Sequence, residues 1–170
     1  MKGETLKMRR GLLVGALLVA ATLAGCSFLG GGDAPPFTNW EPELSPDGRR
    51  LVYESADDGS LDLYTLELET EVVERLTEND VDDWSPSWSA DGTQIAFASN
   101  RDKNVDIYIL VVETREARRL TTDEGDDINP SWANDGRIYF NSNRTGMWEI
   151  FAIDPDGENL TKLTDTPAAE

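Results

Sequence analysis

The sequence predicts an all-β fold, because three similar units follow one another at a fixed period and each unit reads as four short strands. The shared landmarks lie 44 residues apart, or 43 in the later part of the third unit. They are Pro42, Pro86 and Pro130, then Asp47-Gly48, Asp91-Gly92 and Asp135-Gly136, and finally Leu76-Thr77, Leu120-Thr121 and Leu163-Thr164. A repeat of this length is typical of the blades of a β-propeller, which bury their faces by stacking on one another.

The middle unit shows the four strands most clearly. The first is a short extended run, Ser85–Ser89, followed by an Ala-Asp-Gly turn signal. The second, Gln94–Ser99, alternates apolar with small or polar residues, which is the pattern of a half-buried strand. The third, Val105–Val112, is the most apolar, and Ala117–Thr121 is a short edge strand that carries two arginines. Four strands joined by short connections predict one antiparallel blade.

The other two units repeat this pattern. In the first unit, Leu51–Tyr53 is the expected second strand and Leu61–Leu68 the third. In the third unit, the corresponding strands are Arg137–Asn141 and Trp148–Ile153, and Asp154–Gly157 is a tight turn. No helical pattern follows residue 26. We therefore predict a partial β-propeller of three four-stranded antiparallel blades.

The N-terminal segment predicts export. Basic residues precede Gly11–Ala24, an apolar stretch without charge, and this is the pattern of a signal peptide over residues 1–25. The step Leu23-Ala24-Gly25-Cys26 resembles the lipobox of bacterial lipoproteins, which implies cleavage before Cys26 and attachment of lipid to its thiol. An ordinary signal peptide with a chance cysteine is the alternative. Cys26 is the only cysteine, so no disulfide is expected.

The rest of the chain divides into a tether and a repeat domain. Glycine and proline are frequent after Cys26, so residues 26–36 are expected to be the lipidated cysteine and a flexible tether. The repeat domain is expected over 37–170, with blades at about 37–80, 81–125 and 126–170. The formal charge is −18, and removal of residues 1–25 takes away four basic residues and one acid and leaves −21. Such a surface is repelled by nucleic acid and is consistent with solubility.

The residues and motifs of several common catalytic arrangements are missing. The chain has no histidine, which excludes Ser-His-Asp and Cys-His catalysis and histidine-based zinc sites. It has neither a Gly-x-Ser-x-Gly elbow nor a P-loop. We therefore expect no enzymatic activity, no cofactor and no metal.

The loops that precede the innermost strands carry the candidate binding residues. In a propeller such loops surround one mouth of the central channel, and loops commonly carry function. The candidate partner-binding mouth consists of Asn39, Trp40, Asp82, Asp83, Trp84, Asp126, Asp127 and Asn129. The carboxylate and amide oxygens of these loops could hold Ca²⁺, but no Asp-x-Asp-x-Asp-Gly loop is present. The favoured interpretation is therefore that the loops are solvated turns. Trp88 and Trp132 are expected to pack between blades.

Two short steps predict a structural role for arginine. Ser-Asn-Arg occurs at 99–101 and at 142–144. We expect Arg101 and Arg144 to bond to a carboxylate or carbonyl of a neighbouring blade rather than to an anionic ligand.

Several motifs together resemble the WD-like repeat of TolB-type β-propellers. They are Pro-Ser-Trp-Ser-Ala-Asp-Gly at 86–92, Ile-Ala-Phe-Ala-Ser-Asn-Arg at 95–101, Asp-Ile-Tyr at 106–108 and Arg-Leu-Thr at 119–121, with partial copies in the other units. The resemblance covers the whole predicted repeat domain. Together with the lipobox-like step at Cys26, it leads us to expect a lipid-anchored, extracytoplasmic module for protein–protein interaction or scaffolding at the cell envelope, facing the periplasm or the cell surface. A propeller that binds a sugar, a peptide or Ca²⁺ is the alternative.

The number of blades departs from this family, whose propellers usually have six or seven. Three blades cannot close a ring, so the first and third would expose apolar flanks. One explanation is that two copies join by homodimerisation into a six-bladed ring, or that a partner's blades complete it. The other is a truncated remnant of a longer propeller protein.

Overall fold

The computed structural model describes residues 39–57 and 59–166, and this part of the chain contains twelve strands and no helix. Accordingly, no helix long and apolar enough to cross a membrane is found in it. The predicted signal peptide and tether, including Cys26, lie outside the described residues and stay predictions.

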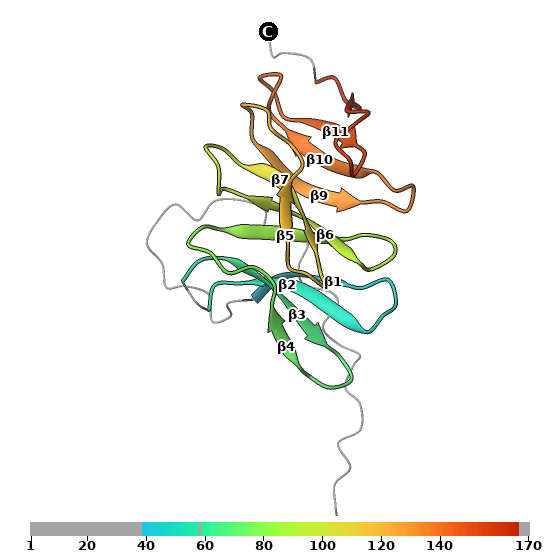
Figure 1. Cartoon of the computed structure of the whole chain (residues 1–170). Helices are drawn as coiled ribbons and strands as arrows, with labels where there is room; N and C mark the ends of the chain where they lie inside the picture. Colours follow the sequence, from blue (N-terminus) through green and yellow to red (C-terminus); the bar gives the residue numbers. More distant parts are fainter. Residues whose placement is uncertain (1–38, 58, 167–170) are drawn as a thin grey trace, which may run out of the picture. The chain divides into compact units, whose positions relative to one another are not determined.

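The strands form three four-stranded antiparallel sheets, each built from four consecutive strands (Figure 1). The first blade contains β1 (Asn39–Leu44), β2 (Arg50–Ser55), β3 (Asp62–Glu67) and β4 (Val73–Arg75). The second blade contains β5 (Asp83–Trp88), β6 (Gln94–Ser99), β7 (Asp106–Val111) and β8 (Ala117–Arg119). The third blade contains β9 (Asp127–Trp132), β10 (Ile138–Ser142), β11 (Glu149–Ile153) and β12 (Thr161–Lys162). The prediction of an all-β, partial propeller of three antiparallel blades is confirmed.

The recurrent proline marks a β-bulge in the innermost strand of every blade. The pairing of β1 with β2 skips two residues between Trp40 and Glu43, and β5 and β9 skip at the same place. The residue before each proline has a positive φ, 47° at Glu41, 50° at Ser85 and 53° at Asn129. A proline cannot donate a ladder hydrogen bond, so it fits where the ladder is interrupted.

The closing Leu-Thr step satisfies a buried acid in each blade. In the first blade, the hydroxyl of Thr77 accepts a hydrogen bond from the backbone N–H of Leu63 at 3.0 Å and donates to the carboxylate of Asp62 at 3.0 Å. The equivalent pairs are Thr77 with Asp62, Thr121 with Asp106, and Thr164 with Glu149. Buried polar groups need such partners, which explains why the motif recurs at the same place in every unit.

Two apolar cores lie between consecutive blades. The core between the first and second blades consists of Val52, Leu63, Leu76, Trp88, Ile95, Phe97, Tyr108 and Leu110. The core between the second and third consists of Ala96, Ala98, Ile107, Ile109, Leu120, Ile138, Phe140, Phe151 and Ile153. Successive residues of β6 and β7 therefore serve opposite cores, as the alternation of a strand requires. Trp88 and Trp132 both pack between blades as predicted, although Trp132 is only partly buried.

Candidate functional site

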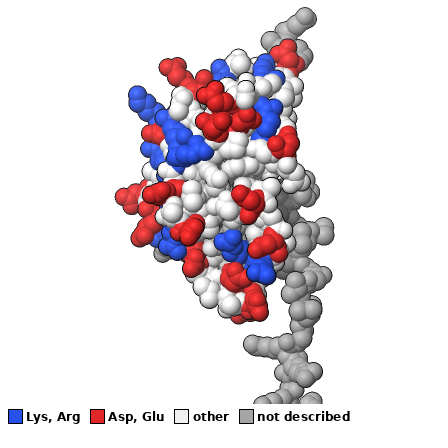
Figure 2. Space-filling model, turned by 45° about the vertical axis from the view of Figure 1, so that its right-hand side comes forward, with Lys and Arg blue, Asp and Glu red and all other residues white. Residues whose placement is uncertain are grey.

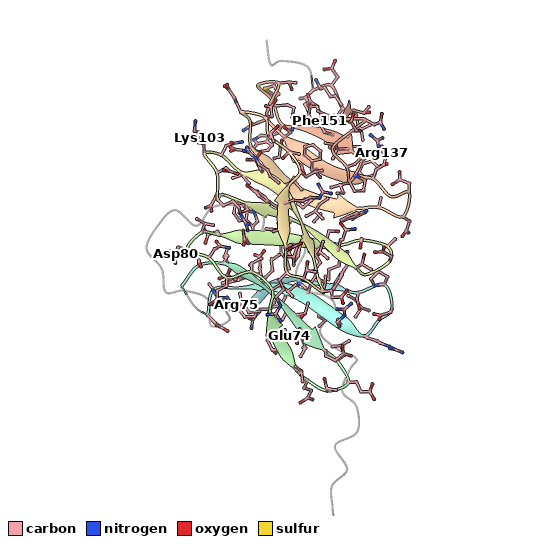
Figure 3. All side chains as sticks on the ribbon, in the orientation of Figure 1. Glu74, Arg75, Asp80, Lys103, Arg137 and Phe151 are labelled. Carbon is pink, nitrogen blue, oxygen red and sulfur yellow. The ribbon has the colours of Figure 1, made fainter. Side chains whose placement is uncertain are left out.

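One end of the blades carries the loops that enter the innermost strands and those that join the second and third strands of each blade. We call it the loop end, and within the described residues it consists of 56–57, 59–61, 76–82, 100–105, 120–126 and 143–148. Figure 3 shows Asp80 and Lys103 on this side, whereas Arg137, from the turn between β9 and β10, lies on the opposite side. The candidate mouth residues lie at or beside the loop end.

Two of the candidate acids form ion pairs inside the blades. Asp83 and Asp127 have no exposed surface. Arg101 donates to both carboxylate oxygens of Asp83, at 2.7 and 2.8 Å, and Arg144 donates to Asp127 at 2.7 Å. Because neither carboxylate can reach a partner, we remove both from the candidate partner-binding mouth. Both arginines have a structural role, as predicted, but each binds a carboxylate of its own blade and not one of a neighbouring blade.

Asp82 and Asp126 join consecutive blades. The carboxylate of Asp82 accepts a hydrogen bond from the backbone N–H of Leu61 in the first blade, at 3.0 Å. Asp126 accepts from the N–H of Val105 in the second blade, at 3.1 Å. Both side chains are half-buried. Their position at the same step of two blades indicates a structural function, which matches the favoured interpretation of Asp side chains bonded to nearby backbone N–H groups.

The remaining candidates differ in exposure. Asn39 and Asn129 are exposed, and Trp40 is half-buried. Trp84 packs against the core between the second and third blades. Asn39, Asn129 and the accessible part of Trp40 therefore remain as candidate contacts for a partner.

The loop end also carries exposed charges that the sequence analysis did not single out. The exposed acids there include Asp57, Asp80, Asp102, Asp123 and Glu124, and the exposed cation is Lys103. On the face that Figure 2 shows, acidic and basic side chains are interspersed. The local excess of acid at the loop end favours contact with a basic surface.

Two further acids, which were not predicted, lie between the first and second blades. We call this contact the first joint, and the contact between the second and third blades the second joint. Glu54 is buried, and its carboxylate accepts a hydrogen bond from the backbone N–H of Ser85 at 2.7 Å. Burial raises the pKa of Glu54 to about 7, against the lowering effect of that hydrogen bond. Burial also raises the pKa of Glu43, which accepts from the N–H of Trp88 at 2.8 Å. The sequence could have indicated this position, because Glu54 lies two residues after Val52 and therefore on the same, core-facing side of β2.

A missing hydrogen bond in the third blade leads to a stability prediction. The side-chain amide of Asn79 donates to Asp83 at 2.7 Å, but its equivalent in the next unit is Asp123, which has no such donor. Correspondingly, Oδ1 of the buried Asp127 finds no hydrogen-bond partner among the described residues. Asp123→Asn is therefore expected to raise the free energy of unfolding by about 1 kcal/mol, measured by urea denaturation.

The matched control for this change is Asn79→Asp, which removes the donor that Asp83 already has. It is expected to lower the free energy of unfolding by about 1–2 kcal/mol. A stabilising effect of Asn79→Asp, or a loss of stability in Asp123→Asn, would contradict the assignment.

The carboxylates of the acidic loops are the groups from which a metal site could be built. Among residues 39–57 and 59–166, no group of three or more His, Cys, Asp or Glu side chains is arranged so that it could hold a metal ion. The acids of the loop end are instead engaged by arginine and backbone N–H groups, or separately exposed.

Comparisons with known proteins agree with this geometry. The family described as the tricorn protease N-terminal beta propeller domain matches residues 62–170. Compared with proteins of curated function, the sequence gives no match. A TolB-type protein from Agrobacterium tumefaciens is 30% identical, with a TM-score of 0.68 over 72% of this chain and 45% of that one. TolB from Acinetobacter baumannii is 27% identical, with a TM-score of 0.68 over 75% of this chain and 32% of that one.

A more distant likeness shows the fold alone. A puromycin-hydrolysing peptidase from Mycobacterium tuberculosis is 14% identical, with a TM-score of 0.61 over 73% of this chain and 20% of that one. This chain corresponds only to the propeller part of such peptidases. It spans less than half the length of the TolB structures it matches.

Proposed function

Because this chain belongs to the family of the tricorn protease N-terminal beta propeller domain, as a TolB-like propeller, we propose that it is a protein-interaction module of the cell envelope. The observation that carries this proposal is the likeness to two TolB structures at 27–30% identity over about three quarters of the chain. The proposed role is binding rather than catalysis. It applies to the part of the protein that this sequence covers.

We propose that lipid on Cys26 places the module at the membrane. The lipobox-like step and the apolar segment before it support this anchor. Two acyl chains hold a protein at a bilayer far more firmly than one, whereas the acidic surface would be repelled by anionic lipids. In this proposal the module is extracytoplasmic, facing the periplasm or the cell surface.

The anchor is tested by mass spectrometry and fractionation. The full chain is expected to lose residues 1–25, to carry diacylglycerol on Cys26 and to sediment with membranes. Cys26→Ser is expected to move it to the soluble fraction. A wild-type protein with an unmodified Cys26 thiol would refute the lipid anchor and would leave the fold and the partner-binding proposal untouched.

We propose that the partner has a basic surface and binds the loop end with it. Asp80 and Glu124 are exposed acids there, from the loops that enter β5 and β9. The double variant Asp80→Lys, Glu124→Lys is expected to reduce recovery of the partner from cross-linked membranes by roughly tenfold, since like charges across an interface cost several kcal/mol.

A matched double variant controls for the change in net charge. Glu69→Lys and Glu113→Lys alter exposed acids at the opposite end of the first and second blades. This control is expected to recover the partner as the wild type does. Equal loss in both variants would mean that overall charge, and not the loop end, determines binding. Addition of Ca²⁺ should leave recovery unchanged, whereas a Ca²⁺ requirement would favour the ligand-binding alternative.

A further inference from the structure

The two joints between blades are built from equivalent positions. We call the face of a blade that is turned to the preceding blade its leading face, and the opposite one its trailing face. The leading face of the second blade consists of Trp88, Ile95, Phe97, Tyr108 and Leu110, and that of the third of Trp132, Ile138, Phe140, Phe151 and Ile153. The trailing face of the second blade consists of Ala96, Ala98, Ile107, Ile109 and Leu120. A joint therefore pairs one trailing with one leading face.

The first blade has a leading face of the same composition. Its positions are occupied by Leu44, Leu51, Tyr53, Tyr64 and Leu66. The rings of Tyr53 and Tyr64 are in contact, with 5.8 Å between their centroids. The equivalent pairs of the other blades are in contact too, at 5.7 Å for Phe97 with Tyr108 and 6.0 Å for Phe140 with Phe151 (Figure 3 labels Phe151). This face is thus constructed like the two that receive a neighbouring blade.

The third blade has a corresponding trailing face, whose positions are occupied by Tyr139, Asn141, Ile150, Ala152 and Leu163, so one of them is polar where the second blade has Ala98. Ile150 is 41% exposed, whereas its equivalent Ile107 is 0% exposed in the second joint. On the first blade, Leu44 is 52% exposed, whereas its equivalent Trp88 is 3% exposed. Both outer faces therefore expose apolar side chains that a protein normally covers.

We propose that a second copy of this chain covers both, with the trailing face of the third blade of one copy packed on the leading face of the first blade of the other. The contact continues the pattern of the two existing joints, because each outer face is the counterpart of the other. Three blades from each copy give a ring of six, within the typical range of about four to eight blades, whereas three copies would exceed it. The two contacts of the ring are identical and heterologous. This proposal does not depend on the lipid anchor or on the loop-end partner.

Polar groups for the same joint are also in place. In the second joint, the N–H of Asp127 donates to the carbonyl of Val105 at 2.8 Å, and the N–H of Trp132 donates to the hydroxyl of Ser87 at 3.0 Å. The equivalent acceptors on the third blade are the carbonyl of Trp148 and the hydroxyl of the exposed Ser131. The equivalent donors on the first blade are the N–H groups of Asn39 and Leu44.

The test co-expresses two whole chains with different tags and measures how much of one is recovered with the other. The wild type is expected to co-purify. Ile150→Glu, which would bury a charge in the contact, is expected to lower recovery at least about tenfold. Val72→Glu is the control, because Val72 is 52% exposed in the turn between β3 and β4, and this variant is expected to co-purify like the wild type.

Mixing variants distinguishes a heterologous contact from a symmetric one. Leu44→Asp alone and Ile150→Glu alone are each expected to fail to self-associate. A Leu44→Asp copy mixed with an Ile150→Glu copy is expected to regain pairing, because one intact trailing face and one intact leading face remain. A monomeric wild type, unchanged recovery in Ile150→Glu, or failure of the mixed pair would overturn the proposal.

Discussion

Replacing Arg101 by methionine is expected to lower the free energy of unfolding by roughly 3–5 kcal/mol, because it leaves a buried carboxylate without its cation. Arg101 donates to both oxygens of Asp83, whose side chain has no exposed surface. The guanidinium also lies over the ring of Tyr108, at 4.5 Å from its centroid, so it contributes to packing of the first joint. The measurement is urea denaturation followed by tryptophan fluorescence.

The first blade shows which double variant can serve as the control for Arg101→Met. Where the second blade has Asp83 and Arg101, the first has Asn39 and Asp57, so a blade can form without this ion pair. Asp83→Asn should cost less than Arg101→Met, because the side chain of Arg101 is 26% exposed and can still reach water. In the double variant Asp83→Asn, Arg101→Met, part of the loss should be recovered, by more than about 1 kcal/mol. Additive effects would show that the carboxylate is not the source of the cost.

The fold could be predicted from the sequence because each blade is encoded locally and three times over. The strand predicted at Gln94–Ser99 forms over those same residues as β6. The recurrent landmarks have structural causes that act within one blade, namely a bulge at the proline and a satisfied acid at the closing threonine. A strand that is hard to recognise in one unit can therefore be located from the equivalent positions of the other two.

The candidate site was predicted less well, because charge alone does not tell which acids are buried. Asp82 and Asp83 are neighbours in a loop-like acidic stretch, yet one accepts a hydrogen bond across a joint and the other forms an internal ion pair. The register explains the second case, since Asp83 pairs with Ser99 and so lies close to Arg101 in its own blade. That register depends on the bulge in β5, and the sequence alone does not show how this bulge shifts the pairing with β6.

Glu54 is expected to make the protein less stable as the pH rises from about 5 to about 8. Burial raises its pKa to about 7 in the folded state, while the unfolded value is near 4.5. Between these values the folded protein keeps a proton that the unfolded chain has released, so the contribution is complete below the unfolded pKa and is lost as the pH passes the folded one. The change attributable to this residue is on the order of 2–3 kcal/mol.

Glu54→Gln isolates the effect. The amide oxygen can still accept the hydrogen bond of Ser85, but the side chain no longer titrates, so the variant should be more stable than the wild type at pH 8 and its stability should vary less with pH. Other groups do not reproduce this difference, since both proteins share them. The exposed Glu69→Gln is the control, and its stability should follow the wild-type curve. Parallel curves for Glu54→Gln and the wild type would contradict the prediction.

The effect of Glu54 should also be confined to one joint. Glu54 bridges the first and second blades, whereas the equivalent position in the second blade is Ala98, which packs in the core of the second joint. Raising the pH adds repulsion from Glu41 and Asp82 to the desolvation cost of the charged carboxylate. Amide hydrogen exchange at Ser85 should therefore accelerate from pH 5 to pH 8, after correction for intrinsic rates, more than at Asp127 in the second joint. In Glu54→Gln the difference between the two amides should become smaller, because the side chain at position 54 no longer gains charge over this range.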